Sequence, residues 1–329
     1  MTKDTLLLSL ESDADLKQAA TLLSAGKLVA IPTETVYGLA ASAHDDNAIK
    51  GVFAAKNRPS DHPLILHIGQ FSQLADWVID VPASAKLLAE HCWPGPLTMI
   101  FNKAPGVSGL ITGGRDTIAI RMPDKTRLRQ LLSVCGPVVA PSANLHKKIS
   151  PTCAQQVMDG LNGRIDAVLD GGDCHLGLES TIVDLTVLPV RILRAGPYYA
   201  EQLAAIMGEN VVLPSSHDVA VAGNMPAHYQ PNTPASLFTR QALEANILKR
   251  ECNGPTLAII HMSELPLVRL NNASIHSIKL STQREKYASQ LYQALSQADR
   301  MNCDEIWIEQ PPYEWHEVID RVSRACFKA

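Results

Sequence analysis

Five polar loops, each close to the end of an apolar run, carry the side chains of this chain that could do chemistry. The first is the turn PTETVYG (32–38), which places Thr35 among other polar groups directly after the run LVAI. Loops at strand ends are where α/β proteins bind their ligands. The alternative for this segment is a hairpin turn whose hydroxyls bond their own backbone.

Two cations and a histidine flank the next apolar run. Lys56 and Arg58 stand just before Pro59, where a helix is expected to end, and His67 lies near the end of PLILHI (63–68). The cations could clamp phosphates, Arg58 through two parallel bonds and Lys56 as a point charge. The alternatives are charge–dipole complementarity at a helix end for the cations and a hydrogen-bonded core residue for His67.

Arg121 interrupts the apolar run TIAIRMP (117–123). Burying a guanidinium without a partner is costly. We therefore expect Arg121 to face either a carboxylate of the protein or a bound anion.

The remaining two loops are VVAPSANLHKKIS (138–150) and GLESTIVDL (177–185), the latter followed by RILRAG. They add five candidate residues: Ser142, Asn144, Ser150, Ser180 and Arg194. Each loop is a weak signal alone. Five of them in one compact domain favour a pocket for a polyphosphate and an amino acid.

Familiar catalytic signatures are missing from the sequence. It contains no P-loop, no G-x-G-x-x-G after a strand, no H-E-x-x-H and no G-x-S-x-G. No nucleophile and no metal-ligand cluster is predicted, so catalysis is expected to depend on positioning and charge stabilisation.

Apolar periodicity and turn residues predict alternating strands and helices. Helices are expected from Asp13 to about Gly26, from Asp45 or Asp46 to Lys56, over 82–91, 124–134, 152–159 and 282–298, and from about 314. Strands are expected over 28–32, 63–68, 97–101, 117–122, 137–140, 166–170, 180–185, 190–194, 256–260 and 304–310. Tight antiparallel spacings mixed with helical crossovers imply an α/β fold with a mixed sheet.

Length and composition predict two domains. The chain has 329 residues, more than a single core usually supports. The segment PSSHDVAVAGNMPAHYQPNTP (214–234) is rich in Pro, Ser, Gly and Asn and is the best linker candidate. We therefore predict a first domain over 1–210, a linker over 211–234 and a small C-terminal α/β domain over 235–329.

Charge and cysteine usage narrow the class of protein. The net charge is −4, whereas proteins that hold nucleic acid by bulk electrostatics are usually basic, so any RNA contact is expected to be local or transient. The seven cysteines are widely spaced without a C-x-x-C pair, which favours reduced thiols in a cytosolic protein. Neither a signal peptide nor a membrane span is expected.

The loops together resemble the YrdC-like family. PTETVYGLA, the K-x-R at Lys56 and Arg58, the S-x-N at Ser142 and Asn144, SPT at 150–152 and ESTIVD at 179–184 occur in the family's order and at its spacing. The resemblance covers roughly residues 12–208. The ending HYQPNTP (228–234) of the linker and the small α/β unit after it look like the longer, two-domain synthases of the family.

This resemblance implies a fold and a reaction. The expected fold is a twisted mixed sheet around an electropositive cavity, followed by a Rossmann-like domain. The family makes threonylcarbamoyl-AMP from threonine, bicarbonate and ATP and releases pyrophosphate. Its product feeds the tRNA threonylcarbamoyltransferase machinery that modifies the adenosine beside the anticodon, and Mg²⁺ is expected on the triphosphate.

The resemblance also assigns candidate residues to the two substrates. The expected ATP-binding residues are Lys56, Arg58, His62, Thr117, Ser142, Asn144, Ser150, Arg194 and Tyr229. The expected threonine-binding residues are Thr35, His67, Arg121 and Ser180, with Arg121 on the carboxylate. The linker is expected to fold over the cavity mouth; the alternative for Tyr229 is a tyrosine packed between domains.

The sequence departs from the family pattern at two places. Leu145-His146-Lys147 replaces the usual Ser-Gly pair after S-x-N, at the rim of the expected nucleotide site. The linker reads Asn224-Met225-Pro226-Ala227-His228-Tyr229, which is shorter than usual and lacks the family's lysine. Both changes concern how the nucleotide is held.

Three other functions fit parts of the pattern. An RNA-binding module of the same fold disagrees with the acidic charge. A carbamoyl-transfer maturation protein would carry cysteine-rich zinc motifs, which this sequence lacks. A regulatory nucleotide-binding protein would keep the phosphate clamp without the threonine pocket.

Overall fold

The computed structural model describes residues 4–214, 219, 221, 223, 225–250, 254–265 and 275–327. The chain divides into two compact units, one of residues 1–146 and 151–224 and one of residues 147–150 and 225–329. The short segment 147–150 therefore belongs with the C-terminal half of the chain, although the residues on either side of it belong to the first unit. The predicted boundaries at 210 and 234 stay predictions.

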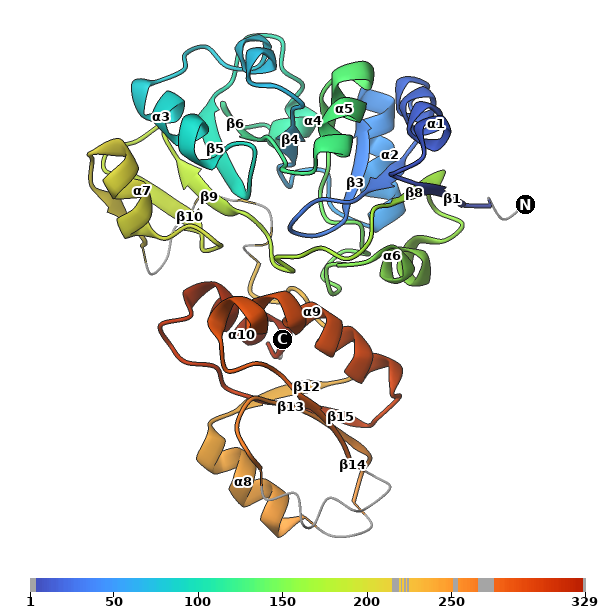
Figure 1. The fold of residues 1–329 in the computed structure, drawn as a ribbon, viewed down its shortest axis with the longest axis vertical. Coiled ribbons are helices and arrows are strands. Elements are labelled where there is room, and N and C mark those ends of the chain that lie inside the picture. Colours follow the sequence, from blue (N-terminus) through green and yellow to red (C-terminus); the bar gives the residue numbers. More distant parts are fainter. Residues whose placement is uncertain are drawn as a thin grey trace. The chain divides into compact units, whose positions relative to one another are not determined.

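The first unit is built around a mixed sheet (Figure 1). Its strands are β1 (Leu6–Ser9), β2 (Val29–Ile31), β3 (Gly38–Ser42), β4 (Ile65–His67), β5 (Leu97–Asn102), β6 (Thr117–Arg121), β7 (Val138–Val139), β8 (Ala167–Asp170), β9 (Thr181–Asp184), β10 (Val190–Arg194) and β11 (Val211–Val212). They lie in the order β1-β8-β2-β3-β7-β4-β6-β5-β9-β10-β11. Parallel pairs such as β4–β6 alternate with antiparallel pairs such as β5–β6, which confirms the mixed sheet.

Helices cover this sheet in two groups. They are α1 (Asp13–Ser24), α2 (Asp46–Lys56), the 3₁₀ helix η1 (Phe71–Asp76), α3 (Ala83–Cys92), α4 (Gly109–Thr112), α5 (Thr126–Cys135), α6 (Ala154–Leu161) and α7 (Ala200–Met207). Helices α1 and α5 pack on one face, over β1, β8, β2, β3 and β7. Helices α2, α3, α4, α6 and α7 share a larger core on the other face. No described helix packs on the first face over β4, β6 and β5, where Val219 and Val221 contact the cluster of Ile65, Ile100 and Ile182.

Local sequence explains where the first helices begin and end. The hydroxyl of Ser12 accepts a hydrogen bond from the Asp15 N–H, so Ser12 is the N-cap rather than Asp13. Gly26 follows the helix with a positive φ of 71°. Asp45 caps α2 by accepting from the N–H groups of Asn47 and Ala48.

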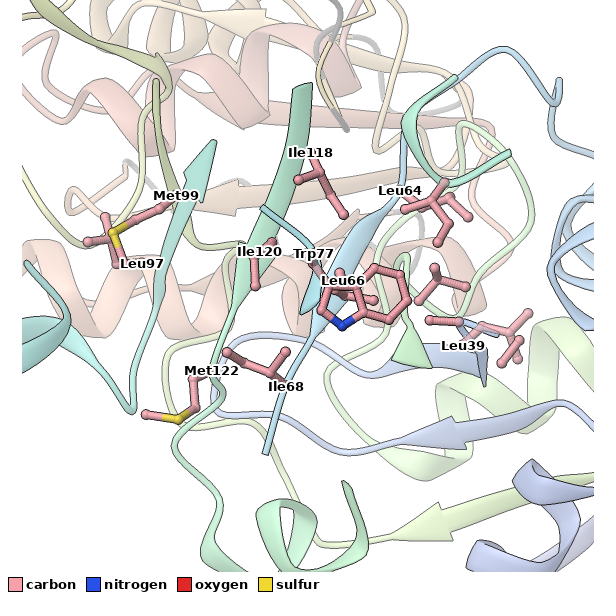
Figure 2. Packing of buried hydrophobic residues seen from close by; sticks show 14 of the residues in the cluster. Leu39, Leu64, Leu66, Ile68, Trp77, Leu97, Met99, Ile118, Ile120 and Met122 are labelled. Carbon is pink, nitrogen blue, oxygen red and sulfur yellow. The ribbon is translucent and has the colours of Figure 1, made fainter. Parts of the chain in front are cut away.

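Side chains along each strand point alternately to the two faces of the sheet, so the hydrophobic core and the candidate site lie on opposite faces. In Figure 2, Leu66, Ile118, Ile120, Leu97 and Met99 pack together on the face that the larger helix group covers. Residues in between point to the opposite face, because successive side chains of a strand alternate.

The second unit is a parallel four-stranded sheet between helices. Its elements are β12 (Ala235–Phe238), α8 (Arg240–Lys249), β13 (Leu257–His261), β14 (Ile275–Lys279), α9 (Arg284–Arg300), β15 (Glu305–Glu309) and α10 (His316–Ala325). The strand order is β12-β15-β13-β14, and all three pairings are parallel. Helix α8 lies on one face and α9 and α10 on the other (Figure 1). Parallel strands with helices on both faces confirm the Rossmann-like prediction.

Candidate active site

The candidate site lies on the face of the first unit's sheet, over β4, β6 and β5, on which none of the described helices packs. His67 pairs with Arg121 across β4 and β6, and Thr98 pairs with the same Arg121 across β5 and β6. Residues paired across neighbouring strands point to the same face. Arg121, His67 and Thr98 therefore project together from three adjacent strands, opposite to the core of Figure 2.

Arg121 is buried and held on three sides. Its Nη1 donates to the hydroxyl of Thr35 at 2.8 Å, and its Nε donates to the carbonyl of Gly95 at 3.3 Å. Its Nη2 lies 2.6 Å from a carboxylate oxygen of Glu34. Of the two partners that the sequence left open, a protein carboxylate is therefore present.

The hydroxyl groups of the PTETVYG loop form a chain of hydrogen bonds in which each donor and acceptor can be assigned. Arg121 can only donate, so the Thr35 hydroxyl accepts from it. The Thr33 hydroxyl donates to the Val36 carbonyl at 2.7 Å, so the 2.8 Å contact between the two threonines must use the Thr35 proton. Thr35 is left with a lone pair for a ligand and no proton to give.

Tyr37 anchors the far end of this loop. Its hydroxyl donates to the carbonyl of Gly172 at 2.8 Å and accepts from the N–H of Gly171 at 3.1 Å. Burial raises the pKa of Tyr37 far above its usual range. The tyrosine is therefore a neutral structural link, and the local hydrogen bonds of the hairpin alternative coexist with the contact to Arg121.

His67 is neutral and its tautomer is fixed. Its Nδ1 lies 3.1 Å from the carbonyl of Ile65, so Nδ1 carries the proton and Nε2 is an acceptor. Burial, together with the positive charge of Arg121, lowers the pKa of His67 to about 3. The core-residue alternative accounts for Nδ1, which contacts the Ile65 carbonyl, and binding of a ligand by Nε2 stays a prediction.

Ser180 links the two predicted substrate sites. Its hydroxyl lies 2.7 Å from that of Thr98 and accepts from Nη2 of Arg194 at 3.0 Å. Nε of Arg194 donates to the Ser180 carbonyl at 3.0 Å. A residue predicted to bind threonine therefore directly positions one predicted to bind ATP.

Lys56 and the S-x-N loop form a single structure. Lys56, at the end of α2, donates through Nζ to the carbonyls of Ser142 and Asn144. Burial, with the nearby Arg58 charge, holds the pKa of Lys56 well below its usual value. The lysine joins the two predicted phosphate-binding segments.

The other predicted ATP residues of the first unit lie on neighbouring segments. Arg58 donates to the carbonyl of Pro63 at 3.0 Å. The rings of His62 and His146 meet edge to face, with centroids 5.4 Å apart, so the departure at residue 146 does lie beside a candidate residue. Thr117 lines a hollow together with Ile65, Ile100, Ala119 and Ile182.

Two predicted ATP residues belong to the second unit. Ser150 is fully buried. Tyr229 has a positive φ of 61°, stacks on Tyr292 with centroids 5.5 Å apart, and lies under the guanidinium of Arg321. Their contact with a nucleotide stays a prediction, as do the ligand assignments of the other candidates.

Three residues of the network were not among the candidates. Glu34 lies inside PTETVYG, but nothing in the sequence pairs it with Arg121. Thr98 is the single polar residue of LTMIF (97–101), the same signal that drew attention to Arg121. Gly95 acts through its carbonyl, which no residue-type pattern can indicate.

Among the described residues, no three His, Cys, Asp or Glu side chains are grouped so as to hold a metal ion. No helix within the described ranges is long and apolar enough to cross a membrane.

Comparison with known proteins gives the family. A family model described as "Telomere recombination" (Sua5_yciO_yrdC) matches residues 21–196, and one described as "Threonylcarbamoyl-AMP synthase, C-terminal domain" matches residues 198–326. Proteins named threonylcarbamoyl-AMP synthase from Pyrococcus abyssi and Bacillus subtilis are 38% and 37% identical to this chain. They cover 88% and 92% of this chain, which covers 87% and 89% of theirs. The solved structure of P. abyssi Sua5 complexed with L-threonine covers 98% of this chain, and 97% of that chain is covered, with a TM-score of 0.88 at 34% identity. The chain therefore belongs to the Sua5/YrdC family, in the two-domain form that carries the Sua5 C-terminal domain.

Proposed function

We propose that this chain is a threonylcarbamoyl-AMP synthase, which condenses threonine, bicarbonate and ATP and releases pyrophosphate. The observation that carries the proposal is the buried Arg121 with Thr35 and His67 beside it, next to the Ser180–Arg194 contact. An amino-acid site beside a cationic site is what this condensation requires.

The reaction needs no enzyme nucleophile. The amine of threonine attacks carbon dioxide with loss of a proton, or bicarbonate with loss of water, to give a carbamate. A carbamate oxygen then attacks the α-phosphorus of ATP, from which pyrophosphate leaves. The protein's tasks are to align the two reactants and to stabilise the charge that develops on the phosphate oxygens. Both tasks suit fixed hydrogen-bond donors.

The threonine site follows from the geometry of three side chains. Arg121 would bind the carboxylate through its remaining N–H groups. Thr35 and Nε2 of His67 both offer lone pairs, so they would accept from the threonine hydroxyl or amine. Ser180 would close this site on the side of β9.

The ATP site would use Arg194, Arg58 and the S-x-N loop. Lys56 sets the position of Ser142 and Asn144, and their side chains and N–H groups would meet the phosphates. Thr117 and His62 would contact the nucleotide from neighbouring segments, and Ser150 and Tyr229 remain candidates. Mg²⁺ would enter with the triphosphate as part of the substrate, held by phosphate oxygens and water.

The product would pass to the tRNA threonylcarbamoyltransferase machinery of the cytoplasm. A regulatory nucleotide-binding module of the same fold is the second candidate; it would bind ATP but turn nothing over.

Pyrophosphate release separates these functions. The purified chain is incubated with ATP, Mg²⁺, bicarbonate and threonine, without RNA, and serine replaces threonine in a matched control. We expect pyrophosphate to appear only when amino acid and bicarbonate are both present, and faster with threonine, since its extra methyl is worth about 1–3 kcal/mol in a fitted pocket. Release that ignores the amino acid would contradict the proposal.

A further inference from the structure

Glu34 has no place in the reaction as described, yet it is one of the most deeply buried charges of the first unit. Only 1% of its surface is exposed, and its carboxylate lies 2.6 Å from Nη2 of Arg121. Burial alone would raise the pKa of Glu34, but the charge and hydrogen bonding of Arg121 and the N–H of Asp124 together lower it. The residue is therefore an anion that does not titrate near neutral pH and is unsuited to act as a base.

Glu34 cannot easily move. Its second carboxylate oxygen accepts from the N–H of Asp124 at 3.1 Å. Its own carbonyl accepts from the N–H of Leu176 at 3.0 Å. The segment that follows β6 thus fixes the carboxylate of Glu34 and the segment that precedes β9 fixes its backbone, so the carboxylate has a fixed position beside Arg121.

The contacts of Arg121 differ in strength. The bond to Gly95 is long, at 3.3 Å, and the bond to Thr35 goes to a neutral hydroxyl. The contact with Glu34 is the short one and joins opposite charges as an ion pair, in which neither N–H of Nη2 is aligned for a hydrogen bond. A guanidinium has five N–H groups, and the hydrogen bonds to Gly95 and Thr35 use two of them, so one N–H on Nη1 and both on Nη2 remain for a ligand. The ion pair with Glu34 fixes the position of Nη2 and therefore the direction in which these N–H groups point.

We propose that Glu34 is a positioning residue, which holds the guanidinium of Arg121 in the orientation that receives the carboxylate of threonine. This inference rests on the proposed function. Glu34 acts only through Arg121 and touches neither threonine nor ATP. Its loss is therefore expected to weaken recognition of the carboxylate group and little else.

The test compares threonine with threoninol, the amino alcohol in which a hydroxymethyl group replaces the carboxylate. Binding of each is measured by titration calorimetry to the full chain and to Glu34→Gln, which keeps an acceptor for Asp124 but removes the charge. We expect threonine to bind at least about tenfold more weakly to the variant and threoninol to bind within about twofold of wild type, a tenfold change being about 1.4 kcal/mol. The KM for ATP should not change.

Two further variants serve as controls. Asp184→Asn removes another buried carboxylate of the first unit, paired with Arg191 at 3.0 Å on β9 and β10, and should leave threonine binding unchanged. In an Arg121→Met background, Glu34→Gln should cause no additional loss of threonine binding, because coupled residues are non-additive. If Glu34→Gln does not fold, Glu34→Asp keeps the charge while withdrawing the carboxylate, and should show the same selective loss to a smaller extent.

The outcomes separate the two proposals. If the wild type binds threonine and the folded Glu34 variants bind it equally well, the positioning role of Glu34 is wrong but the proposed function stands. Equal weakening of threonine and threoninol would also overturn the positioning role, because a general structural defect would then explain the loss. Failure of the wild type to bind threonine would overturn the proposed function, and with it this inference.

Discussion

Replacing His67 with glutamine should remove a large part of the protein's sensitivity to acid. His67 is almost completely buried, with 3% of its surface exposed, and its Nδ1 contacts the Ile65 carbonyl. Burial and the Arg121 charge lower its pKa to about 3, against 6.5 for an unperturbed histidine. Between these two values the unfolded chain binds a proton at this residue and the folded chain does not, so the free energy of unfolding falls as the pH falls.

The size of the effect follows from the two pKa values. By proton linkage, His67 costs the fold almost nothing at pH 7, about 2 kcal/mol at about pH 5, and about 4 kcal/mol at about pH 3. The lost stability is restored as the pH rises through 6.5. In His67→Gln this contribution is absent at every pH.

Urea unfolding at about pH 7 and about pH 5 measures the difference. We expect the wild type to lose about 2 kcal/mol more than His67→Gln between these conditions. His91, exposed on α3, also places its Nδ1 against a backbone carbonyl, at 2.9 Å from Leu87, so His91→Gln is the matched control and should retain the wild-type acid slope. Equal losses in wild type and His67→Gln, or an imidazolium signal of His67 in the NMR spectrum at pH 5, would refute the reasoning.

Three further substitutions test other parts of the site. Lys56→Met deprives two carbonyls of their donor, each worth about 1–3 kcal/mol when buried, so the first unit should melt at a lower temperature and the KM for ATP should rise; an unchanged melting curve would show that the lysine does not support the S-x-N loop. Gly95→Ala would place a methyl group 2.4 Å from the Cys92 carbonyl oxygen, which must displace the Gly95 carbonyl from Arg121; kinetics should show a raised KM for threonine at an unchanged KM for ATP. Arg58→Ala should lower kcat/KM for ATP by an amount equivalent to about 2–3 kcal/mol of transition-state stabilisation, if the guanidinium pairs with a phosphate. Wild-type kinetics in this variant would show that Arg58 does not bind the phosphates.

Strongly patterned elements could be predicted from the sequence, whereas weakly patterned strands could not. Helices α1 and α2 and strands β5 and β6 lie within one or two residues of their predicted bounds, because apolar spacing and caps mark them. Strand β3 was not predicted, since Leu39 is the single bulky apolar residue of GLAAS (38–42) and the rest are small. The structure shows why small residues are needed there: a Cβ on Gly38 would lie 3.1 Å from that of Ala140.

The individual site residues were easier to predict than their partners. Arg121 stands out because a cation inside an apolar run demands an explanation. Its contacts with Glu34 and Thr35 join residues that are 87 and 86 positions away in the chain, and such pairing depends on strand order. The order places β6 between β4 and β5, and no local pattern encodes that arrangement.

The short segment 147–150 has a consequence for how proteins of this architecture can be divided. It is inserted in the sequence of the first unit, between the S-x-N loop and Pro151, but it belongs to the second, where the N–H of Gln230 donates to the Lys147 carbonyl at 2.8 Å. A chain shortened after the first unit would retain this segment but lose the N–H of Gln230 that contacts it. Separating the two units therefore requires a change at two places in the sequence, at 147–150 as well as near 224.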